Sequence, residues 1–238
     1  MLIRFLMLTL FVSQAVAFSR TWKPFRQSGG TLLLRATTTA AGASSAQRHV
    51  LVPMANGSEE IEAVTIIDTL VRGGVKVTSA TVHRGSLEVI CSRGVKLVTD
   101  CHISDAVGKQ FDMIVIPGGM PGSEHLRDSA ELTIMLKDHF QNGRMIGAIC
   151  AAPAVVLKTH GILDGRAATG YPAEKFKNMI GAGYVAAEAT GPWHVSGSVV
   201  TSQGPGTALP FAIKLIELLV GREKAEAVAK EMLINVPL

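Results

Sequence analysis

Cysteines and metal-binding spacings are scarce in this sequence. The 238 residues contain only three cysteines, Cys91, Cys101 and Cys150, and neither a Cys-x-x-Cys pair nor a cysteine–histidine spacing typical of zinc sites. A disulfide framework and a structural metal are therefore not indicated, and an odd count leaves at least one thiol free in a single chain. The question raised by each cysteine is its reactivity.

Acidic residues are absent from the first 48 residues, which carry six basic ones. Arg4 precedes an apolar run over residues 5–12, too short to span a bilayer, and Ala15-Val16-Ala17 follows as a small-residue cleavage site. Residues 1–17 are thus predicted to be a signal peptide, and the basic, Ser/Thr-rich residues 18–48 resemble a transit peptide. This bipartite leader favours a plastid location, although a mitochondrial presequence or simple secretion fits the same residues.

Basic character disappears once this leader is set aside. The whole chain has 23 basic and 19 acidic residues, so without the leader 17 basic residues face 19 acidic ones, a net charge of −2. This net charge excludes binding of nucleic acid through a strongly basic surface. Once the leader is removed, no membrane is expected as a partner. The 47% hydrophobic content suffices for a sizeable core. Residues 49–238 are therefore predicted to form one domain.

Short β-branched runs alternate with helical patterns along this domain. Such alternation predicts an α/β fold, a mainly parallel sheet with helices on both faces. The predicted strands are residues 50–53, 75–80, 113–116, 145–149 and 199–202, and the predicted helices are residues 58–72, 130–141, 151–159, 208–220 and 223–233. Within the irregular stretch 83–99, residues 87–91 and 96–99 are candidate edge strands.

Several candidate functional residues follow predicted strands. In open parallel sheets the ligand crevice lies beyond the carboxyl ends of the strands. Gly118-Gly119, Cys150 and the loop 204–207 all stand at such ends, and Glu62 lies one turn into the helix after the first strand. We therefore expect these residues to gather at one edge of the sheet.

Cys150 stands directly between a predicted buried strand and a predicted helix. Backbone N–H groups and the helix dipole at that place favour thiolate over thiol, which would lower the pKa of Cys150 and make it a nucleophile at an elbow-like turn. The alternative is that Cys150 only packs as a small apolar side chain between Ile149 and Ala151.

Glu62 and the glycine pair also allow two interpretations each. Glu62 either stabilises a helix N-terminus or, among apolar neighbours, has a raised pKa and exchanges protons with the sulfur or a bound carbonyl oxygen. Gly118-Gly119 either forms a plain tight turn or brings N–H groups close to a developing oxyanion. The loop around Pro205 lacks the lysine of a phosphate-binding loop, so phosphate binding is not favoured.

Five segments together carry a family resemblance: NGSEEIEAV (56–64), CSRGVKL (91–97), IVIPGGMPG (114–122), IGAICAAP (146–153) and TSQGPGTA (201–208). In this order they resemble the ThiJ/PfpI superfamily, and within it the DJ-1 and YajL-like branch of protein deglycases and redox chaperones. The likeness covers essentially all of residues 49–238.

This resemblance implies a flavodoxin-like three-layer sandwich, a homodimer with residues 91–93 near its interface, and no metal or organic cofactor. It implies that Cys150 is the nucleophile and redox centre and that Glu62 is its protonated carboxyl partner. The implied pocket residues are Gly118, Gly119 and the Ala151 amide, with Tyr171 and Pro205 beside them.

Two positions depart from relatives of this type. Tyr171 stands where the animal proteins carry a histidine close to the cysteine, so a cysteine–histidine dyad is not available there. Ala151 replaces the histidine that follows the cysteine in PfpI-type peptidases, which argues against proteolysis. Glutamine amidotransferase activity is disfavoured because its GxCxGxQ and HxE signatures are missing.

The resemblance implies a cysteine-dependent enzyme that detoxifies reactive carbonyls, as a protein deglycase or a glutathione-independent glyoxalase converting methylglyoxal to lactate, and that protects against oxidative stress. Its substrates would be small carbonyl compounds or glycated protein side chains. Two alternatives stay open: a non-enzymatic redox-sensing chaperone that uses oxidation of Cys150, and a dimeric binding module with an inert cysteine.

Overall fold

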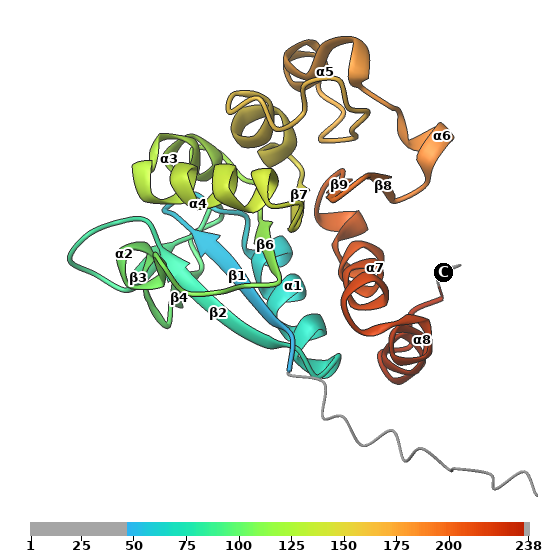
Figure 1. Ribbon diagram of the computed structural model, residues 1–238, viewed down its shortest axis with the longest axis horizontal. Coiled ribbons are helices and arrows are strands. Elements are labelled where there is room, and N and C mark those ends of the chain that lie inside the picture. Colours follow the sequence, from blue (N-terminus) through green and yellow to red (C-terminus); the bar gives the residue numbers. More distant parts are fainter. Residues whose placement is uncertain (1–46, 236–238) are drawn as a thin grey trace, which may run out of the picture. The chain divides into compact units, whose positions relative to one another are not determined.

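The computed structural model describes residues 47–235, in which seven strands form one sheet (Figure 1). Their spatial order is β5-β2-β1-β6-β7-β9-β8, and all neighbours are parallel except β8 and β9. The strands are β1 (His49–Met54), β2 (Lys76–Thr81), β5 (Cys101–His102), β6 (Met113–Ile116), β7 (Met145–Ile149), β8 (Trp193–Ser196) and β9 (Val199–Ser202). A separate antiparallel pair consists of β3 (Glu88–Ile90) and β4 (Lys96–Val98).

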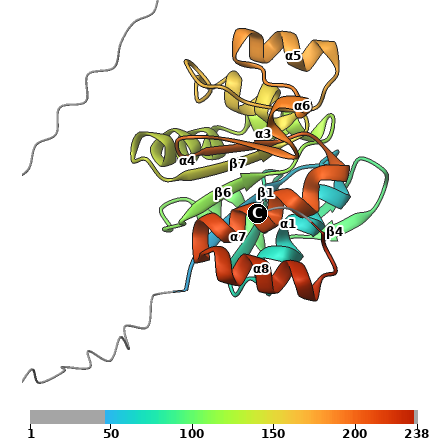
Figure 2. The ribbon, with the colours of Figure 1, turned by 90° about the vertical axis from the view of Figure 1, so that its right-hand side faces the viewer.

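Helices cover both faces of the sheet, which confirms the flavodoxin-like three-layer arrangement (Figure 2). On one face α1 packs on α7 and α7 on α8, while α2, α3, α4 and the π-helix η1 contact one another on the other. The helices are α1 (Glu60–Arg72), α2 (Ile103–Ala106), α3 (Gly122–Asp128), α4 (Ala130–Gln141), η1 (Pro153–Lys158), α5 (Glu174–Ile180), α6 (Ala187–Thr190), α7 (Ala208–Val220) and α8 (Arg222–Glu231), with short 3₁₀ turns η2 (Gly181–Gly183) and η3 (Pro205–Thr207).

The central strands β1, β6 and β7 are mostly apolar, and β9 begins with two valines, because helices bury both faces of these strands. All four residues of β6 and all four of β9 are buried, as are the last five of β1. A strand covered on both sides has no solvent-facing position, so its sequence shows a continuous apolar run instead of alternation. This explains why these strands could be predicted from the sequence.

Capping determines the ends of α1, the helix that carries Glu62. The Glu59 side chain accepts a hydrogen bond from the backbone N–H of Glu62 at 2.8 Å, which satisfies one of the free donors of the first turn. The helix ends at Gly73, and Gly74 follows with φ of +78°. A non-glycine residue rarely adopts that conformation, so the glycine pair turns the chain toward β2.

Three predicted elements differ from the structure. Residues 87–91 and 96–99 were expected as edge strands, but β3 and β4 pair only with each other and lie outside the main sheet. The helix expected over residues 151–159 is a π-helix over Pro153–Lys158. Short elements such as α3, α5 and β8 were not predicted, because they contain too few residues to show a clear hydrophobic period.

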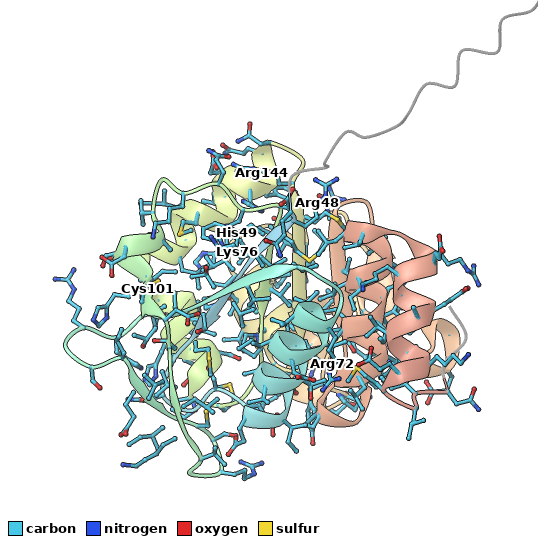
Figure 3. All side chains as sticks on the ribbon, turned by 90° about the horizontal axis from the view of Figure 1, so that it is seen from below. Arg48, His49, Arg72, Lys76, Cys101 and Arg144 are labelled. Carbon is cyan, nitrogen blue, oxygen red and sulfur yellow. The ribbon has the colours of Figure 1, made fainter. Side chains whose placement is uncertain are left out.

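The predicted leader, residues 1–48, lies outside the described residues except for its last two. Both of these contact the domain: Gln47 donates a hydrogen bond to the carbonyl of Gly74, and Arg48 forms a 2.8 Å ion pair with Asp112. Figure 3 shows Arg48 near His49, where β1 begins. Arg48 is therefore part of the folded unit. Among the helices of residues 47–235, none is long and apolar enough to cross a membrane.

Candidate active site

The candidate residues come from the carboxyl ends of four adjacent strands, β1, β6, β7 and β9. Cys150 directly follows β7, Gly118 and Gly119 follow β6, and Pro205 follows β9. Glu62 comes from α1, which follows β1. Because these strands are parallel, their ends meet at the same edge of the sheet, and the structure brings these residues together there.

The backbone at Cys150 adopts an unusual conformation for a residue with a side chain. Its φ is +63°, in the left-handed region, and the chain passes from β7 to η1 at this point. Two hydrogen bonds hold the turn: the N–H of Cys150 donates to the carbonyl of Ser202 at 3.1 Å, and the N–H of Tyr171 donates to the carbonyl of Cys150 at 2.8 Å. Such strain is typical of functional positions, and this one has the geometry of a nucleophile elbow.

The Glu62 carboxyl group is fully buried beside Cys150. Its Oε2 accepts a 2.7 Å hydrogen bond from the N–H of Gly118, while Oε1 has no hydrogen-bond partner of good geometry within the protein. The sulfur of Cys150 lies close enough for each group to alter the pKa of the other. A buried carboxylate with one oxygen unpaired is costly, so the neutral, protonated form is favoured.

Burial dominates the protonation of both groups. It raises the pKa of Glu62 from 4.5 to about 7, against the opposing hydrogen bond from Gly118. Burial, with the negative charge of Glu62, also raises the pKa of Cys150 to about 12, although the N–H groups of Gly119 and Ala151 act in the other direction. The expected lowering of the Cys150 pKa by the helix N-terminus is therefore not found: η1 begins only at Pro153, and desolvation outweighs the two amides.

These pKa values make Glu62 and Cys150 a pair that shares one proton. Burial raises the pKa of both groups, so the pair binds protons more tightly than a free glutamate and a free cysteine would. Transfer of the shared proton from the sulfur to Glu62 produces the thiolate with a neutral carboxyl group beside it. The geometry thus allows Glu62 to act as a general base toward Cys150.

The glycines after β6 permit a close approach of backbone segments. A Cβ at Gly118 would lie 2.5 Å from the Cβ of Cys150 and 2.9 Å from the amide nitrogen of Ala151, so no larger residue fits. Because the Gly118 N–H donates to Glu62, it is not free for an oxyanion. The N–H groups of Gly119 and Ala151 instead approach the sulfur, where they can stabilise negative charge.

A pocket of about 360 Å³ opens over the sulfur. Of the residues expected there, Gly119, Ala151, Tyr171 and Pro205 line it, whereas Gly118 lies behind it and holds Glu62. The lining also includes residues that were not expected in the pocket, among which Ser92 and Arg93 had been expected near a dimer interface: Glu59, Ser92, Arg93, Met120, Ala173, Lys175 and Phe176. Most of these belong to loops or to the unpredicted helix α5. Glu59, Ser92 and Met120 lie within motifs of the family resemblance, but the spacing along the chain does not indicate that they converge with α5.

The remaining cysteines and histidines do not join this site. Burial raises the pKa of Cys91 to about 11, and Cys101 lies at the edge strand β5. Three histidines line a larger cleft of about 740 Å³ near the ends of β2 and α3, but that cleft contains no cysteine. Within residues 47–235, no group of three histidine, cysteine or acidic residues is arranged to hold a metal ion.

The fold and the site together define a flavodoxin-like α/β protein with a cysteine at a nucleophile-elbow turn and a buried glutamate beside it. The model of the DJ-1/PfpI family matches residues 48–218, and the chain belongs to that family. This confirms the resemblance found in the sequence.

Individual relatives support the same assignment. Protein DJ-1 homolog A of Arabidopsis thaliana is 42% identical over 192 residues, which cover 81% of this chain and 48% of the relative. The chain spans about half the length of that protein and of the related homolog B. The glutathione-independent glyoxalase DJR-1.2 of Caenorhabditis elegans is 36% identical over 79% of this chain and 97% of its own length. The solved structure of oxidized Toxoplasma gondii DJ-1 has a TM-score of 0.73 at 48% identity, over 79% of this chain and all of that one.

Proposed function

We propose that this protein converts reactive 2-oxoaldehydes such as methylglyoxal to 2-hydroxy acids, without glutathione or an organic cofactor. The observation that carries the proposal is the pairing of Cys150, at φ +63°, with the buried carboxyl group of Glu62 under an open pocket. A relative at 36% identity is named as a glutathione-independent glyoxalase, which supports the same chemistry. Early adducts of methylglyoxal on protein side chains are substrates of the same type.

The proposed reaction begins when Glu62 takes the proton of Cys150. The thiolate attacks the aldehyde carbon, and the resulting oxygen receives a proton, which gives a hemithioacetal. A proton then leaves the former aldehyde carbon and another is added at the ketone carbon, through an enediol, so that a 2-hydroxy thioester forms. Water cleaves the thioester to release lactate and the thiol. The aldehyde carbon is oxidised and the ketone carbon reduced, so no external electron acceptor is required.

Specific groups of the site match these steps. Glu62 is the buried proton carrier next to the sulfur, and its pKa of about 7 suits proton transfer in either direction at neutral pH. The N–H groups of Gly119 and Ala151 lie beside the sulfur, where they can stabilise the charge on the attacking thiolate.

Lactate formation from methylglyoxal by the purified chain, in the absence of glutathione, tests the proposal. Cys150→Ala is expected to abolish turnover, and Glu62→Gln to lower kcat/KM by about 10²-fold or more, because the proton carrier is lost. Cys101→Ala is the matched control, since that thiol lies away from the pocket and its loss leaves turnover unchanged. Lactate produced by Cys150→Ala at the parent rate would refute the proposal.

A second candidate function is redox sensing by oxidation of Cys150, coupled to chaperone activity. Two peroxide molecules would convert the thiol first to a sulfenic and then to a sulfinic acid, each releasing one water. The N–H groups of Gly119 and Ala151 and the protonated Glu62 are placed to hydrogen-bond the new oxygen atoms. Peroxide-treated protein should gain the mass of two oxygens on the Cys150 peptide, and this gain should be reduced in Glu62→Gln. A mass gain spread over all three cysteines would contradict selective sensing.

We further propose that two copies of the chain associate through α1 and the β3–β4 pair. Exposed apolar side chains occur on both elements, and a hollow of about 420 Å³ lies between Val64 and Val71 of α1 and Val98 of β4. A second copy would bury this apolar surface. Val98→Arg, at a side chain that is 74% exposed in the single chain, should yield a monomer by light scattering. Dimers that persist in this variant would place the interface elsewhere.

A further inference from the structure

Tyr171 is the most exposed aromatic residue among those that line the Cys150 pocket. Its side chain is 44% exposed, whereas Phe176 next to it is buried. The backbone N–H of Tyr171 donates a hydrogen bond to the carbonyl of Cys150 at 2.8 Å. The backbone of Tyr171 is therefore held directly beside the reactive residue. The chain thus places an aromatic surface at the wall of the pocket, where a histidine is absent.

Two residues, Phe176 and Gly204, lie against this ring. The edge of Phe176 meets it in a T-shaped arrangement, with ring centroids 6.2 Å apart and an interplanar angle of 85°. On another side the ring approaches Gly204, where an added Cβ would lie 3.5 Å from Cδ2 of Tyr171. Phe176 is in turn covered by Lys175, whose Nζ lies 4.6 Å from its ring centroid. An aromatic ring supported in this way can contact a ligand with little loss of conformational entropy.

The rest of the pocket combines apolar and charged side chains. Besides Tyr171, the lining includes the apolar residues Met120, Ala151, Ala173 and Pro205, whereas its charged residues are Glu59, Arg93 and Lys175. A volume of about 360 Å³ exceeds what the methyl group of methylglyoxal can fill. When a small substituent occupies the pocket, the apolar surface beside it stays in contact with water and contributes no binding free energy. A larger apolar group would displace that water and bury the surface.

We infer that the pocket recognises 2-oxoaldehydes whose ketone carbon carries an aromatic substituent, which lies against the ring of Tyr171. This inference rests on the proposed reaction at Cys150 and defines its substrate class. Arylglyoxals react by the same steps as methylglyoxal: the sulfur bonds to the aldehyde carbon, a proton moves to the neighbouring carbon, and water releases a 2-aryl-2-hydroxy acid. Phenylglyoxal would therefore yield mandelate. Aromatic rings favour edge-to-face or offset contacts, which the exposed part of Tyr171 permits.

The inference is tested by the kcat/KM for phenylglyoxal divided by the kcat/KM for methylglyoxal. When this ratio is compared between variants, the intrinsic reactivities of the two aldehydes cancel. Tyr171→Ala should lower this ratio by roughly five- to tenfold, the loss expected for one aromatic contact. Tyr171→Phe, which retains the ring, should leave the ratio within about twofold of the parent value. A ratio that is the same in Tyr171→Ala and the parent would overturn the inference while leaving the proposed reaction intact.

The Cys150→Ala variant separates the two proposals. Mandelate formed at the parent rate without Cys150 would refute the proposed reaction, whatever the effect of Tyr171. A binding measurement then decides the inference independently: mandelate, but not lactate, should protect Cys150 from alkylation by iodoacetamide in the parent chain. This protection should be lost in Tyr171→Ala and kept in Tyr171→Phe. Equal protection by mandelate and lactate would overturn the inference even if the protein turns over neither aldehyde.

Discussion

Replacing Glu62 with glutamine should change how the stability of the fold depends on pH. In the folded protein, burial raises the pKa of Glu62 from 4.5 to about 7, so the folded state binds this proton more tightly than the unfolded chain does. Stabilisation from the neutral carboxyl group is therefore fully present below pH 4.5 and is lost as the pH rises to about 7. A shift of this size corresponds to about 3 kcal/mol in the free energy of unfolding.

Glutamine has nearly the same shape and can still accept the hydrogen bond from Gly118, but it does not titrate. The difference in unfolding free energy between Glu62→Gln and the parent should therefore shift in favour of the variant by about 3 kcal/mol between pH 4.5 and pH 8. The unfolding free energy of the variant is compared with that of the parent at each pH, because a second group also makes stability depend on pH. Burial lowers the pKa of His139 to about 4. That histidine contributes stability above pH 6.5, which is lost as the pH falls, and it does so equally in both proteins.

Urea denaturation followed by circular dichroism at half-unit pH steps measures this difference. Glu223→Gln provides the control, since it makes the same chemical change at a glutamate that is exposed on α8. A difference between Glu62→Gln and the parent that stays constant from pH 4.5 to pH 8 would show that folding does not raise the pKa of Glu62, and would refute the burial-driven protonation of this carboxyl group.

Three further predictions concern the reaction, the packing and the leader. The kcat/KM for 2-oxoaldehydes should rise with pH through about 7, as Glu62 loses its proton and becomes able to deprotonate Cys150, and this rise should vanish in Glu62→Gln. Gly118→Ala should lower the unfolding free energy by about 1–3 kcal/mol and slow alkylation of Cys150, because the new methyl group would lie 2.5 Å from the Cβ of Cys150. A Gly118→Ala variant that is as active and as stable as the parent would contradict this close packing. A fluorescent protein carrying residues 1–48 should accumulate in plastids, and its secretion or mitochondrial import would show that the leader is of another type.

The sequence determined the order of the central strands along the chain and the residues at their ends. Strands β1, β6, β7 and β9 are buried on both faces, so their apolar runs are visible in the sequence without knowledge of the fold. Parallel strands place their carboxyl ends at one edge, and from this rule alone Cys150, Glu62 and the glycine pair could be expected to meet. The five sequence segments that contain or flank these residues indicated the family.

Only the tertiary structure decided the protonation of the site and the shape of its pocket. The expected lowering of the Cys150 pKa was wrong because it considered the local amides and not the burial of the sulfur beside Glu62, which depends on residues distant in the sequence. Likewise, Tyr171 and Phe176 become one aromatic wall through the hydrogen bond to the Cys150 carbonyl and the position of α5. The free energies of desolvation and packing depend on all the atoms that the fold places around a group. The spacing of residues along the chain does not reveal which atoms these are.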